Sequence, residues 1–186
     1  QVNNSDFDSG WDYSYHHSFF NNLMGYASNM WDLQNHFQWW TQGWPEHTQP
    51  CNYMVSHDET RLIYEGVNYA GMSLEEAYKK SKLGVTALFT GTGTPMMYHG
   101  QEFGQSSPVS LDPQPLQWDN LSTAEGEELN DYFKNIIWLR NNWEVIRGPN
   151  LEVIYLNNNQ KIIGMKRHDV SLGQTVYCVM NFNNFE

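Results

Sequence analysis

The sequence predicts an α/β fold that is followed, towards the C-terminal end, by an antiparallel β segment. Two observations lead to this prediction. Short apolar runs at 53–55 and 96–98 enclose a helical pattern at 73–90, which is the strand, helix, strand order of a βαβ unit. After Gly148 and Pro149 the apolar period changes from 3.6 residues to extended runs that are separated by turn residues.

The N-terminal part is expected to contain one short strand and one long helix. Residues 7–13 suit a short strand that runs into a loop. From His17 to Trp40 apolar residues recur with a period close to 3.6, which predicts a single amphipathic helix with Trp40 in the core. The Gly-Trp-Pro sequence at 43–45 is expected to end this helix.

The central part carries the βαβ unit. The predicted strand at 53–55 leads into a loop, and Ser73 and Glu76 then have the spacing of a capping box at the start of a helix. Glycines and a proline at 91–95 end that helix before the second strand.

The C-terminal part begins with an irregular, proline-containing connection at 108–115. An amphipathic helix is predicted to start between Ser122 and Glu125. The extended runs at 151–156, 161–166 and 175–180 then predict an antiparallel meander.

Composition limits the kinds of ligand. The chain has 186 residues, enough for one domain or slightly more, and a formal net charge of −11, which argues against nucleic acid and anionic membrane surfaces. The first Lys or Arg is Arg61, and the preceding segment is rich in Trp, Tyr, Asn and Asp. That composition suits an uncharged, hydroxyl-rich ligand, although most of the aromatic side chains are expected to be core.

Other composition signals leave compartment and chain ends open. Cys51 and Cys178 do not have the spacing of a metal site or a disulfide framework. No run of about 18 apolar residues predicts a membrane span. The chain starts at Gln1 without an initiator Met or a signal-like segment, and it stops directly after an apolar strand, so we expect it to be part of a longer protein of unknown localisation.

The strongest chemical signal is a cluster of titratable groups directly after the predicted strand at 53–55. It consists of His57, Asp58, Glu59 and Arg61. A rigid strand that ends in a His-Asp pair presents the pair at its carboxyl end, where α/β barrels assemble their active sites. The alternative is a solvated loop with a local ion pair.

Two stretches resemble motifs of the α-amylase superfamily, glycoside hydrolase family 13. Val55-Ser-His-Asp-Glu-Thr-Arg61 resembles the family's fourth short motif, the His-Asp motif at the end of barrel strand seven. Gly93-Thr-Pro and the following Gly100-Gln-Glu-Phe-Gly104 resemble the approach to strand eight and the end of that strand. The order of the two stretches also agrees with the family.

The resemblance implies a partial TIM (β/α)8 barrel, made of its last two to three β/α units, followed by the antiparallel β segment. Residues 1–146 would be the C-terminal part of the catalytic barrel. Residues 147–186 would begin a small antiparallel C-terminal β domain.

The resemblance also implies roles for individual residues. Asp58 corresponds to the carboxylate that stabilises the transition state, and His57 to the histidine that binds the sugar next to the scissile bond. Arg61 and Trp44 are weaker candidates for substrate contacts. Gly100 and Glu102 correspond to structural positions at the barrel end.

Retaining hydrolysis needs two further carboxylates about 5 Å apart, a nucleophile and a general acid. By the family plan both lie upstream of Gln1. Arg167 and Asp169 have a similar sequence context to the nucleophile motif, but we expect them to be exposed charges at a strand end. An acidic run at Asp6, Asp8 and Asp12 is expected to lie on a solvated face, and the alternative is a contact with substrate.

The predicted function is that of a retaining glycoside hydrolase of this family, acting on α-glucans such as starch or glycogen and on maltooligosaccharides. This chain alone is expected to have no turnover. Alternatives are an α-glucan branching enzyme or other transglycosylase, and a non-catalytic carbohydrate-binding or partner-binding homologue. The expected partner is the missing N-terminal half of the barrel or a second copy of the chain, because an incomplete barrel exposes strand edges. No cofactor or metal ligand cluster is evident, and calcium is implied only by the resemblance.

Overall fold

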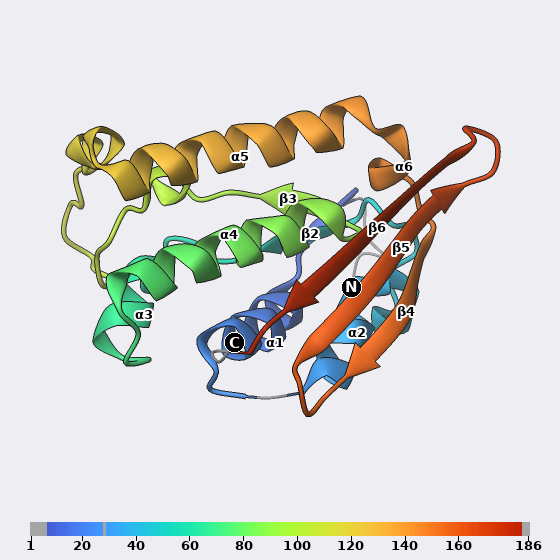
Figure 1. The fold of residues 1–186 in the computed structure, drawn as a ribbon, viewed down its shortest axis with the longest axis horizontal. Coiled ribbons are helices and arrows are strands. Elements are labelled where there is room, and N and C mark those ends of the chain that lie inside the picture. Colours follow the sequence, from blue (N-terminus) through green and yellow to red (C-terminus); the bar gives the residue numbers. More distant parts are fainter. Residues whose placement is uncertain (1–6, 28, 184–186) are drawn as a thin grey trace.

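The computed structural model describes residues 7–27 and 29–183. It contains one three-stranded parallel sheet and one three-stranded antiparallel sheet, with helices packed around and between them (Figure 1). The prediction of an α/β part followed by an antiparallel β part is confirmed. In the described part of the chain, no helix is both long enough and apolar enough to cross a membrane.

The parallel sheet has the order β1-β2-β3, with β2 in the centre. Its strands are β1 (Gly10–Trp11), β2 (Pro50–Tyr53) and β3 (Thr94–Met96). Trp11 lies opposite Cys51, and Tyr53 lies opposite Met96. The strands run parallel because helices carry the chain back along the sheet after each strand.

Helices join the three strands. α1 (Tyr13–Met24), α2 (Met30–Phe37) and the 3-10 helix η2 (Trp39–Gln42) connect β1 to β2. α3 (Leu62–Asn68) and α4 (Leu74–Thr90) connect β2 to β3. The predicted capping box at the start of α4 is confirmed, because Ser73 and Glu76 each bind the other's backbone N–H.

The single helix predicted from His17 to Trp40 is wrong. Gly25 ends α1 in the left-handed region at φ 81°, and Asn29 starts α2 by accepting the backbone N–H of Asp32. Since the chain restarts after this break, the apolar period no longer predicts which side chains face the core. Trp40, expected in the core, is 45% exposed.

The two predicted strands are shifted along the sequence. Pairing ends at Tyr53 in β2 and at Met96 in β3, so Met54 and Val55 lie beyond the sheet ladder although both are fully buried. The apolar run therefore marks burial rather than strand pairing.

One long connection leads from β3 to the antiparallel sheet. It contains η3 (Gln101–Phe103), η4 (Trp118–Ser122), α5 (Ala124–Asn142) and α6 (Glu144–Arg147). The N-cap of α5 is Thr123, which accepts the N–H of Gly126, and this start lies within the predicted interval. The short helix α6 was not predicted.

The antiparallel sheet has the order β4-β5-β6. Its strands are β4 (Leu151–Asn157), β5 (Ile162–Asp169) and β6 (Gln174–Asn181). Figure 1 shows this sheet crossing the ends of the helices, with β4 beside α2. The division of the chain between residues 146 and 147 stays a prediction.

Arg167 is not the exposed charge that we expected. Its side chain is 1% exposed and points to the same face of β5 as Ile163 and Met165. It donates hydrogen bonds to the carbonyls of Thr90 (2.8 Å), Gly91 (2.9 Å), Asn150 (3.0 Å) and Gly148.

A second arginine also binds backbone carbonyls at the end of α4. Arg140 of α5 donates to the carbonyls of Phe89 (2.7 Å) and Gly93 (2.8 Å). Arg167 thus joins the end of α4 to β5 of the antiparallel sheet, and Arg140 joins the end of α4 to α5.

One apolar core connects both sheets. It includes side chains from α1, α2, α4, α5 and all three strands of the antiparallel sheet. Its fully buried members include Phe19, Leu23, Leu33, Met54, Val85, Leu88, Leu129, Phe133, Ile163, Met165, Met180 and Phe182.

Candidate functional site

The His-Asp pair lies at the carboxyl end of β2, after the buried segment 54–56. Nε2 of His57 is 3.3 Å from Oδ1 of Asp58, and the two side chains are 65% and 66% exposed. An exposed imidazole and carboxylate at a strand tip are available to a ligand at that edge of the sheet.

The loop that carries the pair is braced from within. The backbone N–H and the hydroxyl of Ser56 both donate to Oε2 of Glu59 at 2.6 Å. The backbone N–H of Asp58 donates to the Ser56 hydroxyl at 3.2 Å. The Glu59 carboxylate therefore stabilises the loop, while the Asp58 carboxylate is exposed to solvent.

A buried histidine supports the same loop from α1. Nδ1 of His16 is 2.7 Å from the carbonyl of Met54, so this nitrogen carries the donated proton. The ring stacks on Tyr53 at 5.0 Å, and Nε2 lies 3.7 Å from Oε1 of Glu59. Burial lowers the pKa of His16, and the charge of Glu59 acts in the opposite direction.

An exposed aromatic ring that the sequence analysis did not select lies beside the pair. Trp11, the last residue of β1, is 51% exposed, and its ring centre is 6.1 Å from that of His57 and 5.5 Å from that of Tyr53. The signal that could have identified Trp11 is its position, because it ends a strand that runs parallel to β2 and lies next to it.

Trp44, the predicted stacking residue, lies near the start of α1. Its indole N–H donates to Oδ2 of Asp12 at 3.2 Å, and its side chain is half-buried. Asp12 itself is buried rather than solvated, because its other oxygen caps α1 by accepting the N–H of Tyr15. Asp8 is exposed, and Asp6 lies outside the described residues. A sugar contact at Trp44 stays a prediction.

Arg61 is buried, at 4% exposure. Its guanidinium lies 3.6 Å from the centre of the Tyr98 ring and donates to the carbonyl of His99 at 2.7 Å. Its backbone N–H donates to the carbonyl of Ser107. This placement favours a role in fixing the loop after β3 over direct contact with substrate.

Gly100 and Glu102 lie in that same loop. Gly100 has a φ of 87°, and a Cβ there would lie 2.8 Å from Cβ of Gln105, so the position requires glycine. Oε2 of Glu102 is buried without a hydrogen-bond partner among the described residues. The structural role expected for both residues stays a prediction that these surroundings favour.

Within 7–27 and 29–183, no group of three or more His, Cys, Asp and Glu side chains has the arrangement of a metal site.

Comparisons with known proteins place this geometry in context. The model of the family "Alpha amylase, catalytic domain" matches residues 2–148. An amylopullulanase of Thermoanaerobacterium thermosulfurigenes is 30% identical over 130 residues, which cover 66% of this chain and 7% of the relative. The α-amylase MalA of Haloarcula japonica is 44% identical over 78 residues, which cover 42% of this chain and 10% of the relative.

Solved structures also match. A pullulanase from Anoxybacillus, solved in complex with maltotetraose, superposes with a TM-score of 0.77 at 18% identity. The match covers 94% of this chain and 29% of that one. The chain thus spans well under half the length of the proteins that it matches.

Proposed function

The chain belongs to the family of α-amylase catalytic domains, and from this premise we propose that it forms part of the active site of a retaining glycoside hydrolase for α-glucans. Its predicted fold, the last units of a (β/α)8 barrel followed by an antiparallel β segment, is confirmed by the solved structures. The observation that carries the functional proposal is the exposed His57-Asp58 pair beside Trp11 at the carboxyl edge of the sheet.

Each of these three groups suits one requirement of the reaction. During glycoside cleavage positive charge develops on the sugar ring, and a fixed anion such as Asp58 stabilises that charge more than it stabilises the bound substrate. The imidazole of His57 can hold a sugar hydroxyl. The ring of Trp11 can cover the apolar face of a sugar.

The pair needs two more carboxylates, a nucleophile and an acid about 5 Å apart. In this chain Glu59 binds Ser56 and Asp12 caps α1. The resemblance to the family implies that the nucleophile and the acid lie upstream of Gln1, and on that basis we assign both to residues outside this chain. The 186-residue chain should accordingly bind maltooligosaccharides without cleaving them.

The test combines calorimetric titration with maltotetraose and a reducing-sugar assay. Asp58→Asn should weaken binding at this site by about tenfold, the loss of one charge-assisted hydrogen bond. Asp112→Asn is the matched control, because Asp112 is also exposed and lies in the connection before η4. Unchanged affinity in Asp58→Asn would refute the role of the pair, and turnover by the purified chain would refute the assignment of the missing carboxylates.

A further inference from the structure

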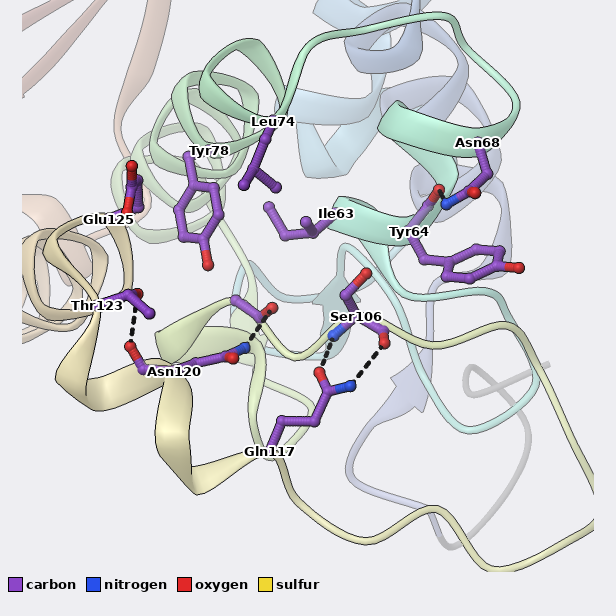
Figure 2. A pocket seen from close by; sticks show the side chains of 11 residues that line it. Ile63, Tyr64, Asn68, Leu74, Tyr78, Ser106, Gln117, Asn120, Thr123 and Glu125 are labelled. Carbon is purple, nitrogen blue, oxygen red and sulfur yellow. Dashed lines mark hydrogen bonds between the residues drawn. The ribbon is translucent and has the colours of Figure 1, made fainter.

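A pocket of about 410 Å³ lies between α3, the start of α4 and the segment that leads from η3 into α5 (Figure 2). His57, Asp58 and Trp11 are not among the residues that line this pocket. We propose that this pocket is a second binding site, separate from the candidate active site, for a short uncharged saccharide.

The two sides of the pocket differ in chemistry. Figure 2 shows the side chains of Ile63 and Leu74, with the ring of Tyr78, on one side of the pocket. Opposite them lie the amides and hydroxyls of the 106–123 segment. A sugar ring has the same division, because its C–H faces are apolar and its rim carries hydroxyl groups.

Part of the polar side is fixed and part is free. Gln117 is held by the backbone of Ser106, donating to its carbonyl at 3.1 Å and accepting its N–H at 2.8 Å. The amide nitrogen of Asn120 donates to the carbonyl of Gly104 at 3.0 Å. This leaves Oδ1 of Asn120 and the hydroxyl of Ser106 without a hydrogen bond to any described residue, on a frame that is already rigid.

Tyr78 extends into the pocket because residue 104 is a glycine. Gly104 has a φ of 78°, and a Cβ there would overlap the Tyr78 hydroxyl and lie 2.6 Å from its Cζ. The phenol therefore lies directly against the Gly104 backbone. Figure 2 shows its hydroxyl directed into the pocket, where it can both donate and accept.

The charge of the pocket selects against anions. Among the described residues, no lysine or arginine lines it, and Glu125 is its one charged lining residue. Burial and the negative charge of Glu125, which lies beside Tyr78 in Figure 2, both raise the pKa of the Tyr78 hydroxyl. A neutral ligand that donates hydroxyl hydrogens to a carboxylate satisfies this arrangement, and a phosphate or carboxylate ligand does not.

Ser106→Leu is the variant that closes the pocket. Gln117 binds the backbone of Ser106 and leaves its hydroxyl free, so a leucine would fill the space while the supporting hydrogen bonds remain. Ser122→Leu is the matched control, because Ser122 is exposed in η4 and does not line the pocket. Tyr78→Phe removes one hydroxyl and keeps the ring.

The experiment is calorimetric titration of maltotriose into the full chain carrying Asp58→Asn, alone and combined with each pocket variant. The choice of an α-glucan probe rests on the proposed function. Asp58→Asn alone should retain saturable binding, Ser106→Leu should weaken it by at least about tenfold, and Tyr78→Phe by about three- to tenfold. Ser122→Leu should leave it unchanged.

The outcomes separate the two proposals. If Asp58→Asn abolishes all binding, or if Ser106→Leu and Tyr78→Phe bind as tightly as the parent, the second site is wrong and the proposed function is unaffected. If the Asp58→Asn change leaves every binding event of the wild-type chain intact while Ser106→Leu removes them all, the pocket is the saccharide site and the role proposed for Asp58 fails.

Discussion

Glu59 and His16 influence each other across 3.7 Å beneath the loop that presents the His-Asp pair. Burial lowers the pKa of His16, while the Glu59 carboxylate favours the protonated imidazole. Glu59→Gln removes that charge and keeps an oxygen that can accept from Ser56. The pKa of His16 should therefore fall further below its usual value, which an NMR titration of its ring protons would measure.

The control for this prediction is Asp32→Asn. Asp32 lies 3.8 Å from His36 rather than beside His16, so the His16 titration should not move. A His16 pKa that stays constant or rises in Glu59→Gln would contradict the proposed electrostatic contact.

Single residues also show the limit of sequence-based prediction. The sequence predicts an exposed Arg167, because a motif match outside its usual context seldom marks a functional site. Its position in β5 indicates burial instead, because residues two apart along a strand point to the same face and Ile163 and Met165 are both buried. What the sequence could not supply was the set of carbonyls, from distant segments, that makes burial of the guanidinium possible.

Among the elements, α4 is the one whose start depends most on residues next to it in the sequence. Ser73 accepts the N–H of Glu76, and Ser73→Ala should lower the free energy of unfolding by about 1 kcal/mol, because an amide at the helix start loses its partner. Urea denaturation followed by circular dichroism measures this. Ser122→Ala serves for comparison and should change little, and an equal loss in both variants would show that the cap does not stabilise α4.

The difference between local and long-range interactions explains which elements could be predicted. The boundaries of α4 follow from Ser73 and from the glycines after Thr90, which act within a few residues of the helix. The ends of β2 and β3 depend on which residues find partners on neighbouring strands, and no local pattern encodes that pairing. The pair His57-Asp58 was found because it directly follows an apolar run, whereas Trp11 gains significance only from its neighbours in the sheet.

At the scale of the whole molecule, Lys80 makes the contact between α4 and the end of the antiparallel sheet dependent on pH. It is buried in α4, and its ammonium group donates to the carbonyl of Phe182, just beyond β6, at 2.8 Å. Burial lowers its pKa to about 8. Between that value and about 10.4, the usual pKa of lysine, the unfolded chain binds more protons than the folded chain, so this group makes stability rise with pH.

Lys80→Met should remove that rise. The measurement is the urea unfolding midpoint at pH 7, 8.5 and 10 for the wild type and the variant, with the exposed Lys79→Met as control. The difference between wild type and Lys80→Met should become more favourable to the wild type as the pH increases. A difference that does not depend on pH would contradict the lowered pKa.

In the described part of the chain, the parallel sheet has two unpaired edges, β1 and β3, and its three strands are too few to close a barrel. We therefore expect the 186-residue chain to self-associate when it is not paired with further barrel strands. Size-exclusion chromatography with light scattering should give a mass above 21.8 kDa that increases with protein concentration. A concentration-independent monomer would contradict this expectation.

The hydrogen bonds of Arg140 and Arg167 at the end of α4 have a consequence for behaviour in acid. Arg140 and Arg167 are held there by backbone carbonyls, and none of their hydrogen bonds in the described structure goes to a carboxylate. A carbonyl oxygen gains no proton on mild acidification, whereas an Asp or Glu partner would be neutralised near pH 4. Acid that protonates the carboxylates of the surface ion pairs therefore leaves the hydrogen bonds of these two arginines unchanged.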